Sequence, residues 1–293
     1  MAVTEASAAA PSALAHDSTP VRSRAWRRRL EIGVPAGLLV LVFGACFLLP
    51  LVAPIPKPTG GDILESGLPA LSPGHLLGTD PNGNDILARI LYGGRSSLIV
   101  ALSVNLLGLL VGGGLGAVSA QLGGLIDSGI MRVLDVFIAF PSLVLTLAVA
   151  QSLGPSQRNT ILALAFFSIP AFARISRAAT LRLREQPFMV AAKLSGTSTR
   201  RVVLRHLAPN IGPQLMTFAM LGMGIVMVIE GALSFLGLGI PAPAPSWGNM
   251  IAMGQLSLSA TPLLVLWPSL MLFLTVIGFN QLGEALRARW SGR

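Results

Sequence analysis

Six long apolar runs, separated by shorter polar segments, dominate the chain. They cover residues 32–52, 97–119, 130–152, 159–179, 211–235 and 262–282. Each is close to the length of about twenty residues that an α-helix needs to cross the hydrocarbon core of a bilayer. The pattern predicts an all-α polytopic membrane protein with six transmembrane helices.

Small residues and prolines modify several of these runs. The second run carries Gly108, Gly112 and Gly116 at four-residue spacing, a pattern that favours close packing of helices in membranes. Prolines well inside the third, fourth and sixth runs are expected to kink their helices. These prolines are Pro141, Pro170 and Pro268.

The N-terminal region, residues 1–30, is rich in Ala, Ser and Pro and ends in a cluster of arginines. Its composition predicts a disordered, basic, cytosolic tail. A basic patch before an apolar run is also how a signal peptide begins. The run 32–52 is too long for that purpose and lacks a clear small-residue cleavage site, so we expect an uncleaved first span. Residues 31–95 then form this span and an extracytoplasmic segment, and residues 96–293 form a domain of five spans.

The longest polar interruption in the second half, residues 185–213, carries helix signals. Pro187 suits the first turn of a helix, and Gly196 can take the left-handed conformation that ends one. Ser198 can cap a following helix, and Pro209 breaks the pattern before the next apolar run. The segment predicts two short helices joined at Gly196, a shape that suits docking into another protein. An ordinary amphipathic surface helix is the alternative that this segment alone leaves open.

The distribution of positive charge predicts the orientation of the spans. The chain has 53% hydrophobic and 11% charged residues and a formal net charge of +9. Of its 21 Lys and Arg residues, only Lys57, Arg89, Arg95 and Arg158 fall in segments expected outside the membrane. This bias places both termini and residues 185–213 in the cytosol. It also explains the net charge without nucleic acid as a partner.

The outer segment before the second span contains a turn signal. Pro81 to Gly83 predicts a tight turn, followed by a helix with Asp85 near its N-terminus. The alternating Asp and Asn residues here partly fit a calcium-binding loop, but the glycine and distal glutamate that such a loop requires are absent. We therefore expect no metal at Asp80 or its neighbours.

Two acidic residues lie within the apolar runs, where an ionised side chain is costly. We expect Asp135 to lie near the cytosolic end of the third span and to pair with Arg132 or Arg174, in preference to a role in substrate binding. Glu230 lies near the outer end of the fifth span. We expect it to fix the outer loop that follows instead of contacting substrate.

Sequence signals for catalysis or nucleotide binding are absent. The only lysines, Lys57 and Lys193, do not follow a glycine, so no Walker A loop exists. The chain has no H-E-x-x-H, C-x-x-C or G-x-S-x-G pattern, its three histidines are scattered, and Cys46 is its only cysteine. We expect no enzymatic activity, no cofactor and no metal site in this chain.

Four segments resemble one transporter family. The spacing of Ala191, Ala192, Gly196 and Pro209 resembles the EAA loop of binding-protein-dependent ABC importer permeases, although Val190 replaces the usual Glu and Ala208 the usual Leu. The L-G-T-D-x-x-G-x-D pattern at 77–85 resembles the peptide and nickel branch of that family. Residues 234–251 and 279–287 also resemble it, so the resemblance extends from Ile32 to Trp290.

The resemblance implies the fold and the partners. It implies a type I ABC importer permease (MetI-like) fold with a cytosolic coupling helix in residues 185–210, in the bacterial inner membrane. It implies a heterodimer with a homologous permease, two cytosolic ATPases that carry the ATP and Mg²⁺, and an extracytoplasmic binding protein. The expected substrate is a di- or oligopeptide, with nickel or a metal chelate as the alternative. A secondary transporter or channel without ATPases is the alternative from another class.

Three groups of residues are candidates for function. The candidate ATPase-coupling residues are Glu185, Phe188, Ala191, Ala192, Leu194, Gly196, Arg205 and Pro209. The candidate outer loop or gate residues are Asp80, Asp85, Glu230, Ser246 and Trp247. Small and flexible apolar residues suited to a repacking surface, which we assign to the permease interface or the path, are Met220, Gly222, Gly224 and Met227. Packing of this last group within the subunit is the alternative.

Overall fold

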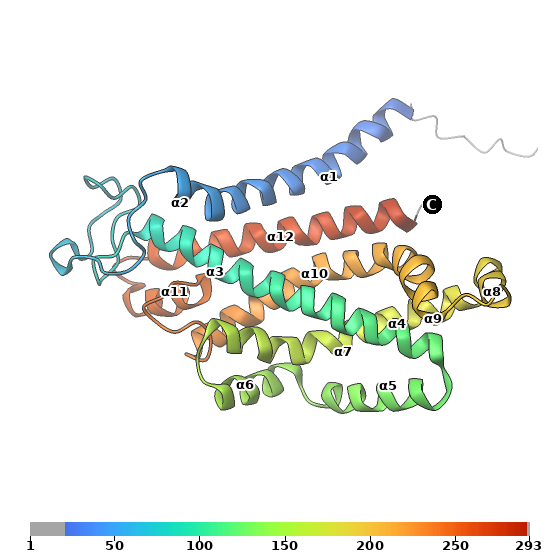
Figure 1. Ribbon diagram of the computed structural model, residues 1–293. Helices are drawn as coiled ribbons and strands as arrows, with labels where there is room; N and C mark the ends of the chain where they lie inside the picture. The colour runs from blue at the N-terminus through green and yellow to red at the C-terminus, as the bar shows by residue number, and fades with distance from the viewer. Residues whose placement is uncertain (1–20, 292–293) are drawn as a thin grey trace, which may run out of the picture.

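The computed structural model of the chain describes residues 21–291, and within that range it is helical and contains no β-strand. Figure 1 shows an elongated bundle whose long helices run along one common direction. Irregular loops gather at one end of the bundle, and a short helical elbow projects at the other. The all-α class predicted from the apolar runs is confirmed.

The helices vary from short turns to spans of 29 residues. The α-helices are α1 (Val21–Phe43), α2 (Leu49–Val52), α3 (Ile86–Leu107), α4 (Gly113–Leu122), α5 (Gly124–Ala139), α6 (Ser142–Leu153), α7 (Gln157–Arg184), α8 (Pro187–Leu194), α9 (Thr199–Arg201), α10 (Ala208–Phe235), α11 (Trp247–Gly254) and α12 (Leu263–Ser291). The π-helical turns are η1 (Gly44–Leu48), η3 (Gly108–Gly112) and η4 (Val202–Leu207), and the 3₁₀ turns are η2 (Ile63–Glu65) and η5 (Gln255–Ser257).

Five helical segments of the described chain are long and apolar enough to cross a membrane, and a sixth is present if the bent pair α5–α6 counts as one. The second predicted span is longer than expected, because α3, η3 and α4 form one helical segment over Ile86–Leu122. Its start therefore lies eleven residues before position 97. The extra turns come from the outer segment, where Asp85 caps the helix.

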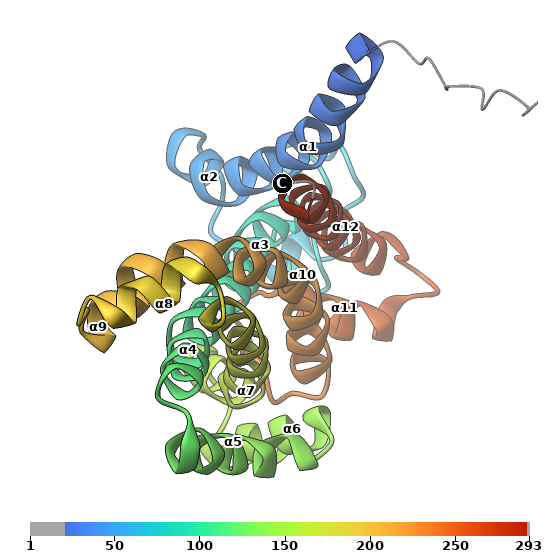
Figure 2. The same cartoon turned by 90° about the vertical axis from the view of Figure 1, so that its right-hand side faces the viewer.

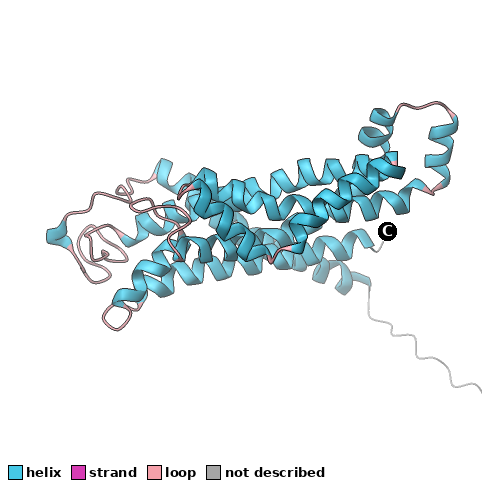
Figure 3. Ribbon diagram, turned by 90° about the horizontal axis from the view of Figure 1, so that it is seen from below, coloured by secondary structure: helices cyan, strands magenta, loops and turns pink. Residues whose placement is uncertain are grey.

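The third predicted span is broken. Residues 130–152 do not form one helix, since α5 and α6 meet at Phe140–Pro141 with a bend of 88°. The break faces the viewer in Figure 3. Pro141 lacks the N–H that would continue the ladder, and its ring pushes Phe140 into an extended conformation. The kink predicted at Pro141 is confirmed, whereas α7 and α12 continue through Pro170 and Pro268 as single helices.

The predicted disordered tail is wrong for its last ten residues. Residues 1–20 lie outside the described range, but residues 21–30 are helical and lead into the first span without a break. Extending an existing helix costs little compared with starting one, and arginine is a good helix former. The helix of the span therefore propagates toward the N-terminus.

The predicted glycine face packs within the subunit, against α7. A Cβ atom at Gly112 would lie 3.0 Å from the Cβ of Phe172, and one at Gly116 would overlap the backbone at Ala173. Gly108 likewise lies against Ser168. The close packing of η3 and α4 against α7 follows from these three glycines. Figure 2 shows α1 and α2 on one side of the bundle and α5 and α6 on the other.

Candidate functional site

The elbow, formed by residues 185–207, begins where α7 stops. Helix α8 follows directly, and Gly196 then adopts a left-handed conformation with φ of +69°. Thr197 N donates to Ala192 O over 3.1 Å across this turn. The predicted joint between two helices at Gly196 is confirmed, and the first of them is short. A side chain at Gly196 would be strained by the backbone alone, because no neighbouring atom lies within 4 Å of the position that its Cβ would occupy.

The second helix of the elbow is not short. It continues from α9 through η4 into α10, so the break predicted at Pro209 is wrong. Ala208 N donates to Val203 O, which is the wider spacing of a π-helical turn. We attribute the continuity to this turn, since it ends just before Pro209 and accommodates the proline without a break. Ser198 occupies the N-cap position of α9 but makes no capping bond through its side chain.

One side of α8 is anchored and the other is exposed. Met189 is fully buried and packs with Val202 and Leu207. Phe188 and Leu194 are 43% and 85% exposed, and both are large apolar side chains. Exposed apolar surface of this kind is typical of a contact with another protein. The arrangement agrees with a docking surface held rigidly by its own small core.

Most of the remaining candidate coupling residues are exposed as well. Ala191 is exposed and Ala192 is half-buried, both on α8. Glu185 lies exposed at the end of α7, and Arg205 and Pro209 are exposed on the helix that follows the elbow.

One exposed side chain and one hydrogen bond near the elbow were not indicated by the sequence. Val190, which stands where the family motif has Glu, is exposed and adds to the apolar surface. Arg184 Nη1 donates to Ala120 O over 2.9 Å and ties the end of α7 to the end of α4. Val190 therefore extends the exposed apolar surface, and Arg184 supports the elbow from outside the motif.

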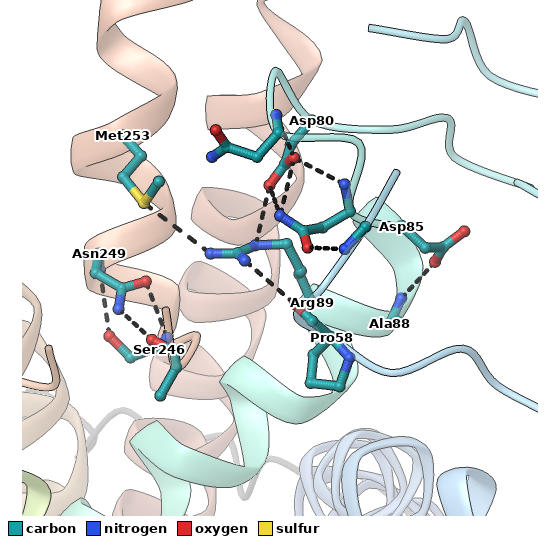
Figure 4. Close-up of polar contacts among 12 residues, drawn as sticks. Pro58, Asp80, Asp85, Ala88, Arg89, Ser246, Asn249 and Met253 are labelled. Atoms are coloured by element: carbon teal, nitrogen blue, oxygen red, sulfur yellow. Dashed lines mark hydrogen bonds and ion pairs between the residues drawn. The ribbon is translucent and has the colours of Figure 1, made fainter. Parts of the chain in front are cut away.

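At the opposite end, Asp80 organises the outer turn (Figure 4). Its Oδ1 accepts from Asn82 N at 2.8 Å and from Asn84 N at 2.9 Å, and Gly83 N donates to its carbonyl oxygen. The predicted turn is confirmed. Amide donors and Arg89 Nε, 3.4 Å from Oδ2, surround the buried carboxylate. Over residues 21–291 there is no group of three or more acidic, His or Cys side chains arranged to hold a metal ion.

Asp85 begins α3 as predicted. Its Oδ1 accepts from Ala88 N over 2.7 Å, so it is the N-cap of the helix. Its Oδ2 lies 2.8 Å from His75 Nδ1, and His75 Nε2 lies 3.3 Å from Glu65 Oε2. The hydrogen bond to Asp85, with a smaller one to Glu65, raises the pKa of His75 above its ordinary value. No local pattern indicated these contacts, because ten residues separate the members of each pair.

Arg89 is buried. The sequence had indicated only that it is a positive charge in a segment expected outside the membrane. Its Nη1 donates to Pro58 O over 3.2 Å, and its Nη2 lies 4.0 Å from Met253 Sδ. A cavity of about 320 Å³ lies between the Asp80 turn, Arg89 and α11. The contact with Pro58 joins residues 31 positions apart, a separation at which no local pattern is informative.

Glu230 is fully buried among hydroxyl groups. Ser97 Oγ donates to its Oε2 over 3.0 Å and Ser234 Oγ to its Oε1 over 2.7 Å. Trp247 N donates in turn to Ser97 Oγ, and Ser246 Oγ to Ser234 Oγ, each over 3.3 Å. One serine hydroxyl thus connects each carboxylate oxygen of Glu230 to the start of α11.

Ser246 and Trp247 form a rigid start to α11. Ser246 Oγ accepts from Asn249 N, and Asn249 Oδ1 accepts from Ser246 N, which together make a capping box. The indole Nε1 of the fully buried Trp247 donates to Ile90 O over 2.9 Å. These residues lock the outer loop onto the start of α3.

The residues assigned to the permease interface lie mostly inside the subunit. A Cβ at Gly222 would overlap Asn105 Oδ1, and one at Gly224 would lie 3.1 Å from Val276 Cγ1. Met227 is fully buried, and Met220 packs partly buried against the same core. The contacts of this group therefore agree with the alternative, internal packing. Small and flexible residues do not by themselves distinguish an internal contact from an external one.

Two ion pairs connect α5 to α7. Arg174 Nη2 lies 2.7 Å from Asp135 Oδ1, so Arg174, and not Arg132, is the partner of Asp135. Arg177 Nε and Nη2 each donate over 2.7 Å to the two carboxylate oxygens of Asp127. The second pair was not expected from the sequence.

The fold and the sequence both match a known transporter class. The chain superposes on a chain of the MetNI methionine ABC transporter in an inward-facing conformation with a TM-score of 0.54 and 16% identity, covering 68% of this chain and 95% of that one. At this identity the match concerns the fold alone, which is MetI-like. Residues 105–291 match the family described as binding-protein-dependent transport system inner membrane component.

Curated relatives agree with this match. The chain is 39% identical over 213 residues to the dipeptide transport system permease protein DppC of Alkalihalophilus pseudofirmus, covering 73% of this chain and 70% of that protein. It is 37% identical over 269 residues to the glutathione transport system permease protein GsiD of Pectobacterium atrosepticum, covering 89% and 88%. The GsiD protein of Escherichia coli is 36% identical over 267 residues, covering 89% and 87%.

The chain belongs to the family of inner membrane components of binding-protein-dependent transport systems. It is an ABC importer permease, and it crosses the membrane several times.

Proposed function

We propose that this chain is one of two homologous permeases in an ATP-driven importer of di- or oligopeptides. It forms half of the translocation path, with both termini in the cytosol. Two cytosolic ATPases hydrolyse ATP, and an extracytoplasmic binding protein delivers the substrate. The elbow transmits the movement of the ATPases to the spans.

The exposed apolar side of α8 carries the coupling part of this proposal. Met189 anchors α8 to the small core on its buried side. Phe188 and Leu194 remain exposed near the left-handed turn at Gly196. A preorganised surface loses little conformational entropy when it docks, so it can transmit force without deforming first. Of the candidate coupling residues, Phe188 and Leu194 are the large apolar side chains that remain exposed.

The substrate class is supported by the names of the relatives. DppC is a permease for dipeptides and GsiD a permease for glutathione, which is itself a small peptide. Nickel or a metal chelate is the alternative substrate. The charged residues that line the outer cavity, Asp80 and Arg89, pair with each other, so the carboxylate of Asp80 is not free to bind a bare cation.

At the outer end we propose that Asp80, Asp85, Glu230, Ser246 and Trp247 hold the loop that receives the binding protein. Their role is to keep this loop rigid and not to contact substrate. All five are buried and bonded within the subunit, which supports a positioning role.

Transport by a reconstituted complex tests the proposal. The chain, the homologous permease, the two ATPases and the binding protein from the same operon are placed in liposomes, with ATP supplied on the side of the ATPases. We expect uptake of labelled di- or tripeptides that stops without ATP or without the binding protein. Uptake of nickel in place of peptides would establish the alternative substrate, and uptake without the ATPases would establish a secondary transporter.

A further inference from the structure

The two ion pairs between α5 and α7 differ in their exposure. In the pair of Arg177 and Asp127, the side chains are 35% and 11% exposed, and the contact is bidentate. In the pair of Arg174 and Asp135, they are 50% and 53% exposed, and one hydrogen bond joins them. A guanidinium carries five N–H donors, so most of the hydrogen-bonding capacity of Arg174 remains available.

The exposed pair lies at membrane depth. Helix α7 has 28 residues and is therefore about 42 Å long, against a hydrocarbon core of about 30 Å. An upright, centred α7 extends about 6 Å beyond the core at each end. Arg174 lies ten residues before the end of α7, so it is about 9 Å inside the core on this estimate.

The surroundings of the pair are apolar and exposed. Val136 beside Asp135 is 60% exposed, and Ile138 and Phe140 further along the chain are exposed as well. Charged groups facing lipid at this depth are costly, so such groups face a water-filled cavity or the interior of an assembly. The subunit itself does not bury this pair.

The broken helix beside the pair is a second indication that this region faces water or protein and not lipid. Helix α5 ends at Ala139, shortly after Asp135, at the 88° bend next to Pro141. The last carbonyl groups of α5 have no continuing helix to accept bonds from, because Pro141 has no N–H. Irregular backbone at membrane depth is tolerated only where it is buried in protein or lines a water-filled cavity.

We propose that Arg174 and Asp135 form a contact site in the translocation path for the two charged ends of an unblocked peptide. Arg174 receives the peptide carboxylate, for which the planar guanidinium has a matching geometry. Asp135 receives the ammonium group. This inference rests on the proposed peptide-import function and names residues of the path. The pair of Arg177 and Asp127 instead fastens α5 to α7.

Photo-crosslinking in the complete, reconstituted importer tests the site. A photoreactive side chain replaces Ile138, which lies three residues after Asp135 on the same face of α5. A second complex carries it at Val40, exposed on α1 at the opposite side of the bundle. During ATP-driven uptake, we expect a radiolabelled dipeptide to crosslink at position 138 and not at position 40. The proposal would be overturned if the complex imports the peptide but position 138 crosslinks only to lipid or to the partner permease.

Charge variants distinguish a substrate contact from an ion pair that only joins α5 to α7. We expect Arg174→Gln and Asp135→Asn to lower the crosslink and the uptake by roughly tenfold or more at unchanged complex recovery. Arg174→Lys should retain part of both. The exchanged pair Arg174→Asp with Asp135→Arg should keep recovery unchanged and should not restore uptake, whereas normal uptake by this double variant would show that the pair only joins α5 to α7. If the wild-type complex imports no peptide, the proposed function is wrong, and the site proposal fails with it.

Discussion

At the scale of single residues, Ser97 connects two parts of the outer end. Its hydroxyl donates to Glu230 and accepts from the backbone of Trp247. Ser97→Ala would leave both partners in a buried position with one bond fewer. We expect a loss of about 1–3 kcal/mol in the free energy of unfolding, because buried polar groups without partners are costly.

The neighbouring serine is the control for that change. Ser96 is half-buried and donates only to Tyr92 O, one turn earlier in the same helix. We expect Ser96→Ala to change the free energy of unfolding by no more than about 0.5 kcal/mol. Thermal unfolding of the purified chain in detergent measures both variants. Equal effects of the two substitutions would show that the Glu230 contacts do not stabilise the outer end.

The outer segment should be sensitive to pH through His75. Its pKa is raised by hydrogen bonding to Asp85, and to a lesser degree to Glu65, above the ordinary value of about 6.5. A group whose pKa is raised on folding stabilises the fold fully below its unfolded pKa. That stabilisation is lost as the pH rises through the higher, folded value.

Hydrogen exchange of the outer segment measures this effect. After correction for intrinsic rates, we expect protection of residues 62–85 to fall as the pH rises from about 6 toward and above the raised pKa. His75→Gln removes the titrating group and should flatten the profile. A wild-type profile as flat as that of the variant would show that His75 is not linked to folding here.

At the scale of elements, the elbow depends on the backbone at Gly196. No atom would contact a Cβ there, so the cost of Gly196→Val comes from the left-handed conformation, at roughly 1–2 kcal/mol. The elbow can escape this cost by tilting α8 away from its small core. We expect uptake to fall severalfold while the spans still insert, because the apolar side of α8 no longer meets the ATPase as it should.

Gly212→Ala is the matched control for the elbow. Gly212 lies in α10, has no positive φ and also has no atom near its Cβ direction, so Ala is favoured there by helix propensity. Membrane level, co-purification of the ATPases and uptake are compared for the two variants. Undiminished uptake and co-purification with Gly196→Val would exclude the elbow as the coupling element.

The helices show which parts of the fold could be predicted from the sequence and which could not. Apolar runs of sufficient length located the long helices, since the bilayer fixes that length. Pro141 indicated a kink but not its angle of 88°, because a proline sets where a helix can break and its packing partners set how far it turns. The continuous helix through Pro209 was missed for a related reason, as a π-helical turn leaves no composition signal.

The candidate site also combines local features that the sequence predicts with long-range contacts that it does not. Gly196, the Asp80 turn and the Asp85 cap are local and followed from residue types alone. The bond between Ser97 and Glu230 joins residues 133 positions apart, which no local pattern indicates. Gly222 and Gly224 do pack closely, but small residues indicate close packing without naming the partner helix, which here belongs to the same subunit.

At the scale of the whole molecule, the charge bias predicts which end faces the cytosol. The elbow and the outer loop lie at opposite ends of the bundle in Figure 1. Exposed positions suited to labelling are Leu204 in η4 and Ala244 before α11. Trp247, although near the outer end, is fully buried and unsuited to a labelling experiment.

Cysteine labelling in intact cells tests this orientation. In a Cys46→Ser background, an impermeant thiol reagent added outside should label Ala244→Cys and leave Leu204→Cys unlabelled until the membrane is opened. The physical reason is that the arginines around the elbow resist translocation, so the whole bundle is fixed with α8 inside. Trp247→Cys serves as a control for burial and should stay unlabelled from either side while the protein is folded. Labelling of Leu204→Cys from outside would reverse the orientation and remove the elbow from the reach of any cytosolic ATPase.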